Sequence, residues 1–273
     1  MLNSPIVFVG IAPHPPIMVP EVGGEMVAEV RESVEAMRVF SERVVSSGAT
    51  TAIIISPHAP LEADSFVAYA GSRLRGDFAN FRAPQATVHA ESDAEMLNAI
   101  AHEAARDGYD LTPIEGYELD HGTAVPLYFL RRNGWHGRVI ALGYSFLPDE
   151  DHGRFGASVR RAVEAVKRPA AFIASGDLSH RLKPGAPAGY NHDAHYFDEE
   201  VVEAIRAGDP ERIPNIDQSL RKLAGECGYR SMLVAIGLSH GLTPNHEVLH
   251  YEAPFGVGYL VAQLAFDKHQ RRQ

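Results

Sequence analysis

Four short runs of apolar residues constrain the fold more than any other feature of this chain. They read IVFVGIA from Ile6, TTAIIIS from Thr50, RVIALGY from Arg138 and AAFIASG from Ala170, and turn residues bound each of them. A strand that is apolar at nearly every position must be covered on both faces, as the inner strands of a parallel sheet are. The four runs therefore predict the buried strands of one parallel sheet.

Stretches with helical periodicity lie between these runs. In the stretch SDAEMLNAIAHEAARDG, Ser92 and Glu95 have the spacing of a capping box, and Gly108 ends the pattern. Because strands that alternate with helices are typical of layered α/β proteins, we expect a three-layer αβα domain with a mostly parallel central sheet. The predicted helices cover about 27–44, 92–108, 149–166 and 198–207.

Two segments depart from this alternation. FVAYAGSRLRGDFANF, from Phe66, predicts an inserted β-hairpin, and HYEAPFGVGYLVAQLAF, from His250, predicts a late pair of strands. The loop 181–198 is rich in proline and glycine, which makes it the best candidate for a lid over an active site. No repeat or linker-like stretch interrupts the chain, so a single domain over 1–273 is expected.

The net charge and the cysteine content of the chain exclude some classes of partner and of cellular compartment. The formal net charge of -10 argues against nucleic acid or an anionic membrane surface as a partner, because both require a basic face. Cys227 is the one cysteine, so an internal disulfide is excluded and a reducing compartment is favoured. No apolar run approaches the roughly 18 residues of a membrane span. We expect a cytoplasmic protein whose partner is a small molecule or another protein.

Histidines follow three of the four predicted strands. His14 lies in APHPP, His58 in SPHAP and His180 in SGDLSH. Ligands of open α/β sheets bind outside the carboxyl ends of the strands, so these three loops are expected to converge on one crevice. Prolines beside His14 and His58 restrict the backbone and suit an imidazole that must keep a fixed direction. The pattern indicates a shared site in which these histidines are ligands or catalysts.

A metal site of this kind also needs an anionic ligand. Two imidazoles and one carboxylate, with coordination positions left open, form the ligand set of non-haem Fe(II) enzymes that activate oxygen. Glu226 precedes the predicted helix 229–238, and a helix N-terminus stabilises a carboxylate. Glu252, in HYEAPFG, is a second candidate. Sequence spacing does not choose between these two.

Two further positions suit proton transfer better than metal ligation. His180 follows Asp177, and a carboxylate near an imidazole can set its tautomer and raise its pKa, as a general acid or base requires. His121 follows Asp120 at the entry to a predicted helix over 125–130. That pair is either part of the site or a helix cap.

Taken together, APHPP, SPHAP, LDHG, SGDLSH, ECG and PFGVGY resemble the class III extradiol ring-cleavage dioxygenases, in their catalytic (B) subunit, and the related Memo family. The resemblance extends from Ile6 to Leu264. It implies a three-layer αβα domain and one mononuclear Fe(II), with His14 and His58 as ligands and Glu226 as the carboxylate. It also implies that His180 is the acid/base histidine, and that His121 is a second pocket histidine associated with substrate and oxygen.

The Glu226-Cys227 pair separates two branches of this superfamily. Memo-type proteins carry a cysteine, in a CG pair, where the dioxygenases carry the glutamate, and this chain has both. One residue step at a helix start turns a side chain by about 100°, so only one of the two readily faces a metal. Glu226 facing inward predicts iron and oxygen chemistry, whereas Cys227 facing inward predicts copper or zinc.

Three functional hypotheses follow. The leading one is oxygen-dependent ring cleavage of a catechol-like or aminophenol-like aromatic substrate by Fe(II). The second is a Memo-like copper-binding or zinc-binding protein without ring-cleavage activity, and the third is a zinc hydrolase, because two histidines and a carboxylate also serve catalytic zinc. A homo-oligomer is expected from the general frequency of symmetric dimers, and the resemblance adds a separate small partner subunit as an option.

Overall fold

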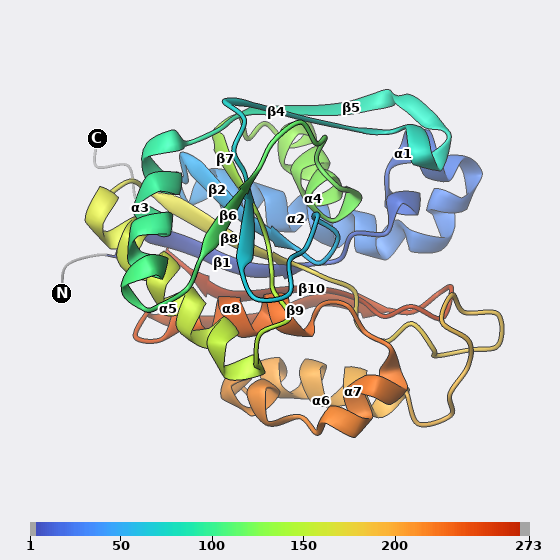
Figure 1. Cartoon of the computed structure of the whole chain (residues 1–273). Helices are drawn as coiled ribbons and strands as arrows, with labels where there is room; N and C mark the ends of the chain where they lie inside the picture. The colour runs from blue at the N-terminus through green and yellow to red at the C-terminus, as the bar shows by residue number, and fades with distance from the viewer. Residues whose placement is uncertain (1–3, 268–273) are drawn as a thin grey trace.

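The computed structural model describes residues 4–267, and its centre is an eight-stranded sheet (Figure 1). The strand order is β6-β3-β7-β2-β8-β1-β10-β9. The four predicted strands are the four adjacent inner strands, and each pairs in parallel with its neighbour among them. They are β1 (Ile6–Ala12), β2 (Thr51–Ser56), β7 (Arg138–Gly143) and β8 (Ala170–Ser175). The prediction of a parallel central sheet is therefore confirmed.

Each inner strand supplies side chains to two separate cores. In β2, Ile53 and Ile55 belong to one core, whereas Ala52 and Ile54 belong to the other, because successive side chains of a strand point to opposite faces. The first core lies beneath α3 (Ala94–Arg106), α5 (Asp149–Val166), α6 (His195–Arg206) and α8 (Tyr229–Ser239). The second lies beneath α2 (Arg31–Ser46) and α4 (His121–Arg132). This is the expected three-layer αβα arrangement.

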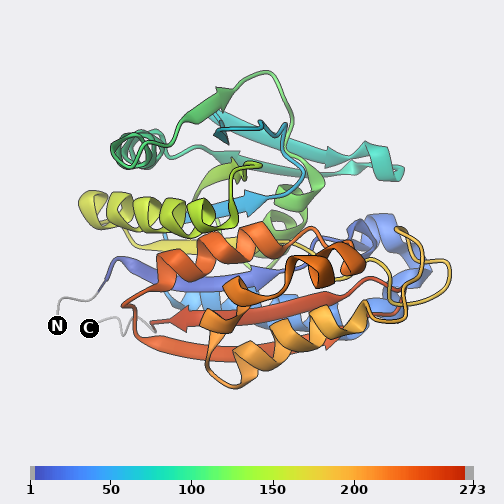
Figure 2. The ribbon, with the colours of Figure 1, turned by 60° about the horizontal axis from the view of Figure 1, so that its bottom comes forward.

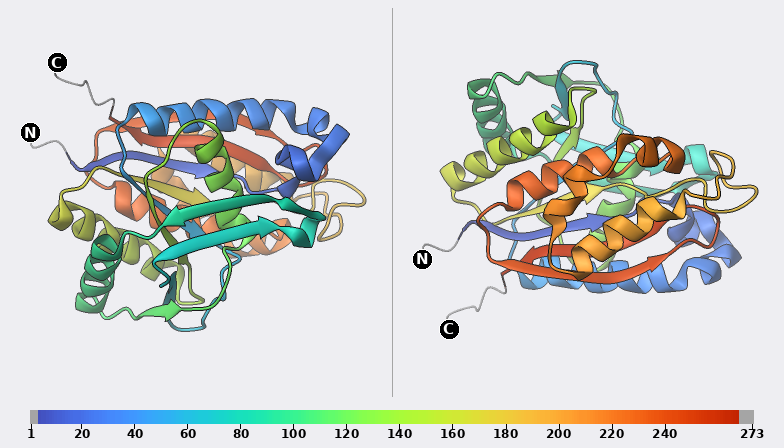
Figure 3. Two further views of the ribbon diagram at one scale, coloured as in Figure 1. Left: turned by 90° about the horizontal axis from the view of Figure 1, so that it is seen from above. Right: turned by 90° about the horizontal axis from the view of Figure 1, so that it is seen from below.

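The C-terminal strands extend the sheet in the antiparallel sense. β10 (Tyr259–Phe266) pairs with β1, and β9 (Pro244–Glu252) pairs with β10 and forms the edge. The late strand pair is confirmed, although β9 begins at Pro244 rather than at His250. Figure 3 shows α2 on one side of this pair and α6 on the other. The two helices thus cover the two faces of the C-terminal strand pair.

The inserted hairpin is present, but its strands differ from those predicted. β3 (Phe66–Tyr69) joins the main sheet between β7 and β6 (Leu111–Ile114), and the separate hairpin consists of β4 (Arg73–Phe78) and β5 (Ala83–Glu91). All four residues of β3 are buried, whereas β4 alternates between exposed and buried side chains. Because β3 is buried on both faces, it lies within the main sheet. The hairpin lies across the top of Figure 1.

Helix boundaries agree with the sequence in most places. α5 covers Asp149–Val166 as predicted, and α4 begins at His121, before the predicted start. The Ser92/Glu95 capping box is wrong: Asp93 is the N-cap of α3, and its carboxylate accepts a hydrogen bond from the Met96 backbone N at 3.3 Å. The remaining elements are short: α1 (Pro20–Gly23), α7 (Gln218–Ala224), η1 (Pro16–Met18), η2 (Gly24–Val30), η3 (Ala79–Phe81) and η4 (Pro210–Asn215).

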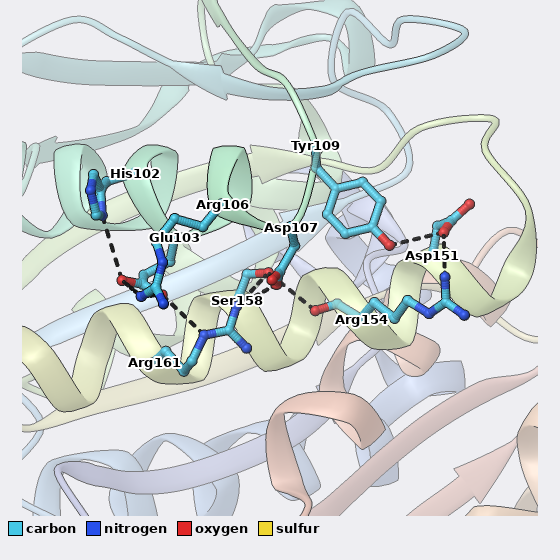
Figure 4. Close-up of polar contacts among 9 residues, drawn as sticks. All are labelled: His102, Glu103, Arg106, Asp107, Tyr109, Asp151, Arg154, Ser158 and Arg161. Carbon is cyan, nitrogen blue, oxygen red and sulfur yellow. Dashed lines mark hydrogen bonds and ion pairs between the residues drawn. The ribbon is translucent and has the colours of Figure 1, made fainter.

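Polar side chains hold α3 against α5, as Figure 4 shows. Arg161 Nε donates to Glu103 Oε2 at 3.0 Å, and the hydroxyl of Tyr109 donates to Asp151 Oδ1 at 2.9 Å. Several members of this network are exposed, and exposed ion pairs contribute about 0–1 kcal/mol each. The network therefore orients the two helices, while the apolar core beneath them provides most of the stability.

Glycines allow α5 and α8 to approach backbone to backbone. A Cβ on Gly156 would lie 2.1 Å from the carbonyl oxygen of Val234, and one on Gly237 would lie 2.0 Å from that of Gly153. The two helices lie side by side over the sheet in Figure 2. This close approach positions the N-terminus of α8, which is preceded by the Glu226-Cys227 pair. Within residues 4–267, none of the helices has the length and apolar character needed to cross a bilayer.

We expect Gly156→Ala to lower the free energy of unfolding by about 1–3 kcal/mol, because the new methyl group overlaps the α8 backbone. Gly153→Ala is the matched control in the same helix: its Cβ would meet nothing closer than the Leu233 carbonyl oxygen at 4.0 Å. That variant should be neutral or stabilised by up to about 1 kcal/mol. Urea denaturation measures both, and equal effects of the two substitutions would contradict the close packing.

Candidate metal centre

Histidines from three different loops meet at the carboxyl edge of the inner strands. His14 follows β1, His58 follows β2 and His121 is the first residue of α4. One potential ligand atom from each of the three lies within 4.8 Å of the others. The Nε2 atoms of His14 and His58 are 3.0 Å apart, and the ring of His121 stacks on that of His58 with centroids 4.2 Å apart. The predicted convergence of His14 and His58 therefore occurs, and His121 joins them.

Ser175 determines which nitrogen of His14 is free to bind a metal. The Ser175 hydroxyl donates to the carbonyl oxygen of Gly122, so its single proton is committed and it can only accept at His14. His14 Nδ1, at 3.0 Å, is then the donor. The lone pair of the neutral ring consequently lies on Nε2, which points into the histidine cluster. His14 is 2 % exposed, so water does not compete for this arrangement.

Asp120 ties the end of β2 to the start of α4. It is the N-cap of α4 and accepts a hydrogen bond from the Thr123 backbone N at 3.1 Å. The hydroxyls of Ser56 and Tyr69 also donate to its carboxylate, at 2.5 and 3.0 Å. Ser56 in turn accepts a hydrogen bond from the backbone N of His58 at 3.1 Å. His58 and His121 are therefore positioned by one shared carboxylate.

These supporting residues were not predicted from the sequence. Ser56 and Ser175 are the last residues of β2 and β8, and both are fully buried. The sequence did contain one indication of their role, a serine at the end of a mainly apolar strand. A buried serine hydroxyl requires a hydrogen-bonding partner. The serine alone does not identify that partner, because the partner lies 53 or more residues away in the chain.

Asp177 is directed toward His14 rather than toward His180. Its Oδ1 accepts a hydrogen bond from the His14 backbone N at 3.0 Å, and its Oδ2 lies 3.7 Å from His14 Nε2. The expected pairing of Asp177 with His180 is thus replaced by a contact with a candidate metal ligand. Burial raises the pKa of Asp177 to about 7, although the hydrogen bond from His14 opposes this rise. His14, Asp177 and Cys227 form a second group with metal-ligand spacing.

Cys227, and not Glu226, lies at the histidine cluster. Cys227 Sγ is 3.6 Å from His14 Nε2 and accepts a hydrogen bond from the Asp177 backbone N at 3.4 Å. The loop after β8 packs directly on the start of α8, because a Cβ on Gly176 would lie 2.1 Å from Gly228 Cα. Burial, followed by the proximity of Asp177, raises the pKa of the Cys227 thiol. A bound cation would oppose this effect and favour the thiolate.

The two predicted carboxylate ligands have other partners. Glu226 Oε2 accepts a hydrogen bond from the Tyr229 backbone N at 2.7 Å, at the first turn of α8. Glu252 Oε1 accepts one from the Ser33 backbone N at 3.0 Å, in the first turn of α2. Among the described residues, neither glutamate belongs to a group with metal-ligand spacing. The geometry therefore offers Asp177 as the carboxylate of the site in place of Glu226 or Glu252.

His180 is near the cluster without belonging to either ligand group. Its backbone N donates to the carbonyl oxygen of Ala224 at 3.0 Å, which fixes the loop after β8. Its Nδ1 is buried and has no hydrogen-bonding partner within residues 4–267. Burial lowers the pKa of His180, the interaction with the Leu178 backbone opposes this shift, and the proximity of His58 adds to it. The ring is therefore neutral at physiological pH and retains capacity to exchange a proton.

The three clustered imidazoles are neutral as well. Burial is the main reason that the pKa values of His14, His58 and His121 are lowered, to about 4 for His121, and repulsion among the rings adds to the effect at His14 and His121. Neutral imidazole is the form that binds metals. Imidazoles with a carboxylate suit Fe(II), and a thiolate adds affinity for copper or zinc. The donor set consequently fits a divalent transition metal.

The predicted lid packs against the loop between β9 and β10. Leu182 N donates to the Gly256 carbonyl oxygen at 3.1 Å, and the Lys183 ammonium donates to that of Pro254. A Cβ on Gly256 would lie 2.7 Å from Ala186, so the two segments are in close contact. Movement of this loop over the site stays a prediction.

Comparisons with known proteins identify relatives of this chain. The family model "Catalytic LigB subunit of aromatic ring-opening dioxygenase" matches residues 9–262. Protein CA_C1420 of Clostridium acetobutylicum is 34% identical over 263 residues, which are 93% of this chain and 56% of that protein. The 3,4-dihydroxyphenylacetate 2,3-dioxygenase of Escherichia coli is 27% identical over 124 residues, 44% of this chain and 45% of that enzyme. The chain thus spans about half the length of the curated relatives that it matches.

A solved structure has a similar fold. The uncharacterized protein JW3007 of Escherichia coli K12 superposes with a TM-score of 0.62 at 16% identity, over 84% of this chain and 92% of that one. At this identity the likeness concerns the fold alone. The family model, by contrast, extends from within β1 to the middle of β10 and includes every residue of the histidine cluster. The chain belongs to the LigB family, the catalytic subunits of aromatic ring-opening (class III extradiol) dioxygenases.

Proposed function

We propose that this protein holds one Fe(II) at the histidine cluster and opens the ring of a catechol-like or aminophenol-like aromatic substrate with O2. The observation that carries the proposal is the meeting of His14, His58 and His121 at the carboxyl edge of the sheet, with the carboxylate of Asp177 beside His14. Family membership supports it, as does the partial match to a dioxygenase whose name specifies a catechol substrate.

His14 and His58 would hold the metal ion, and His121 or Asp177 would supply the third ligand. When bound, Fe(II) would bring the substrate and O2 together and mediate electron transfer between them. His180 would accept a proton from a substrate hydroxyl and return one during ring opening, because its ring is neutral and its Nδ1 is unpaired among the described residues. Asp120 and Ser175 would keep the ligand imidazoles in their directions.

A second function is favoured by one specific observation, the place of Cys227. Its sulfur lies 3.6 Å from His14 Nε2, while the carboxylate of Glu226 is held by α8. A thiolate in the ligand set suits copper or zinc better than Fe(II). The alternative is therefore a metal-binding protein of the LigB family that does not cleave aromatic rings.

Anaerobic loading with Fe(II), followed by addition of catechols and aminophenols in air, should produce oxygen uptake on at least one compound. We expect His180→Ala to lower turnover by about 10²–10⁴-fold while iron stays bound, because it removes a proton-transfer group and no ligand. His58→Ala should instead release the iron. His102→Ala, at an exposed histidine of α3, is the control. Absence of uptake by the wild type on every compound would exclude ring cleavage of these substrates.

Substitutions in the Glu226-Cys227 pair distinguish the two functions. Cys227→Ser should weaken copper binding by at least about tenfold if the thiolate is a ligand, because a hydroxyl is a much poorer ligand for soft metals. Glu226→Gln should leave metal content unchanged, since the amide oxygen can still accept the hydrogen bond from Tyr229 N. Competition titration and metal analysis measure both variants. Loss of metal in Glu226→Gln alone would place that glutamate in the ligand set after all.

Ser175→Ala should weaken metal binding by about 10–100-fold, the usual effect of removing a partner of a ligating histidine. The reason is that His14 Nδ1 loses its acceptor, so the ring can rotate and the proton can move to Nε2. Ser231→Ala is the matched control, because Ser231 is also fully buried but its hydroxyl has no partner among the described residues. Equal metal affinity of the two variants would show that Ser175 does not set the tautomer.

A further inference from the structure

A basic groove lies between the β4–β5 hairpin and the start of β7. Its cavity has a volume of about 750 Å³, and we call it the cationic groove, after four of its lining residues: Arg73, Arg75, Arg131 and Arg138. A second cavity of about 630 Å³ shares Glu91, His136, Gly137 and Arg138 with it and is also lined by Lys167. The two cavities therefore form one continuous basic surface.

The groove and the histidine cluster share no residue. Arg138 is the first residue of β7, and Thr50 and Pro169 immediately precede β2 and β8, so these lining residues occupy the amino edge of the sheet. Arg75 lies farther along the hairpin, where its carbonyl oxygen accepts a hydrogen bond from Leu119 N at 2.7 Å. The histidines occupy the carboxyl edge. Strands of six residues separate these edges by about 20 Å. The groove is thus a separate feature of the molecule, and its occupant does not have to be the substrate of the metal centre.

Arg131 gives the groove a rigid, positively charged wall. Its Nε donates to the His89 carbonyl oxygen at 3.1 Å, and its two terminal nitrogens donate to those of Trp135 and Gly137 at 3.0 and 3.1 Å. Within residues 4–267, no carboxylate lies within ion-pair distance of this half-buried guanidinium. Carbonyl dipoles hold the guanidinium in place without cancelling its charge, so the adjacent cavity has a positive potential.

Two exposed arginines of the groove have unused donors. In the part of the chain that the structure describes, Arg73 and Arg138 make neither a side-chain hydrogen bond nor an ion pair. Arg75 makes only long contacts, 3.6 Å to Glu118 and 3.9 Å to Asp77. Glu91 is the one carboxylate that lines either cavity. On a chain with a net charge of -10, this local excess of positive charge stands out.

We propose that the cationic groove binds a phosphorylated small molecule of nucleotide size through its phosphate groups. Guanidinium groups match phosphate oxygens in geometry as well as charge, and Arg73 and Arg138 have free donors from two sides of the cavity. The hydroxyl of Thr87 and the imidazoles of His89 and His136 provide further hydrogen-bonding groups in the same lining. The volume lies within the range of small-molecule sites. The acidic chain as a whole disfavours a nucleic acid as occupant.

Calorimetric titration of the full chain tests this proposal, after dialysis against a chelator so that no metal binds the phosphate. Inorganic pyrophosphate and ADP are the probes. We expect one site per chain, with an affinity that falls as salt is added. Arg73→Gln combined with Arg138→Gln should weaken binding by roughly ten- to a hundredfold, and both positions are exposed, so folding should be unaffected. Arg212→Gln, at an exposed arginine paired with Glu200, is the control and should bind like the wild type.

Any of four outcomes would overturn the proposal. The first is no binding of either probe at millimolar concentration in low salt, and the second is equal binding by the double variant and the wild type. The third is loss of binding in His14→Ala, which would locate the phosphate at the histidine cluster. A short single-stranded RNA that binds where pyrophosphate and ADP do not would also refute it, in favour of a nucleic-acid surface. Because the probes bind a metal-free protein, the result does not depend on ring-cleavage activity.

Discussion

Burial of both faces of β1, β2, β7 and β8 is the constraint on which the rest of the structure depends. These strands are covered by helices on both faces, as inner strands of α/β sheets are, and they pair in parallel, so they end at the same edge. That edge is where the loops with His14, His58 and His180 begin. These histidines are far apart in the chain, and they converge because the apolar strands that precede them are packed side by side between two layers of helices.

The chemistry of the cluster depends on the burial of His14, which is 2 % exposed, whereas His58 beside it is exposed and His121 is half-buried. Burial keeps the His14 imidazole neutral, and water cannot replace a hydrogen-bonding partner that this ring loses. Ser175 and Asp120 use this environment to hold ring directions that a metal requires. The same burial raises the pKa values of Asp177 and Cys227, so binding of a cation would be coupled to release of protons from the site.

The two edges of the sheet differ in electrostatic character. The two ligand groups at the carboxyl edge gather neutral imidazoles with the Asp177 carboxylate and the Cys227 thiol, a set that suits a cation, and Asp120 adds a second carboxylate beside them. The cationic groove at the amino edge gathers arginines with Glu91 as the single carboxylate of its lining, a set that suits an anion. Arg168 in the adjoining cavity is paired with Asp93 and Glu95. Both edges differ from the acidic average of the chain, because each is set by the few side chains that form it.

The sequence by itself determined the four inner strands, the extent of α5, the late strand pair and the meeting of His14 and His58, because these depend on the local periodicity of apolar residues and on where strands end. Only the tertiary structure decided that β3 joins the sheet, that Asp93 rather than Ser92 caps α3, and that Asp177 serves His14. It also decided that Cys227 lies at the cluster while Glu226 caps α8. That choice depends on the contact between Gly176 and Gly228 and on the glycine packing of α5 against α8. Such contacts join segments that are distant in the chain. A local sequence pattern therefore does not determine which side chain they direct toward the cluster.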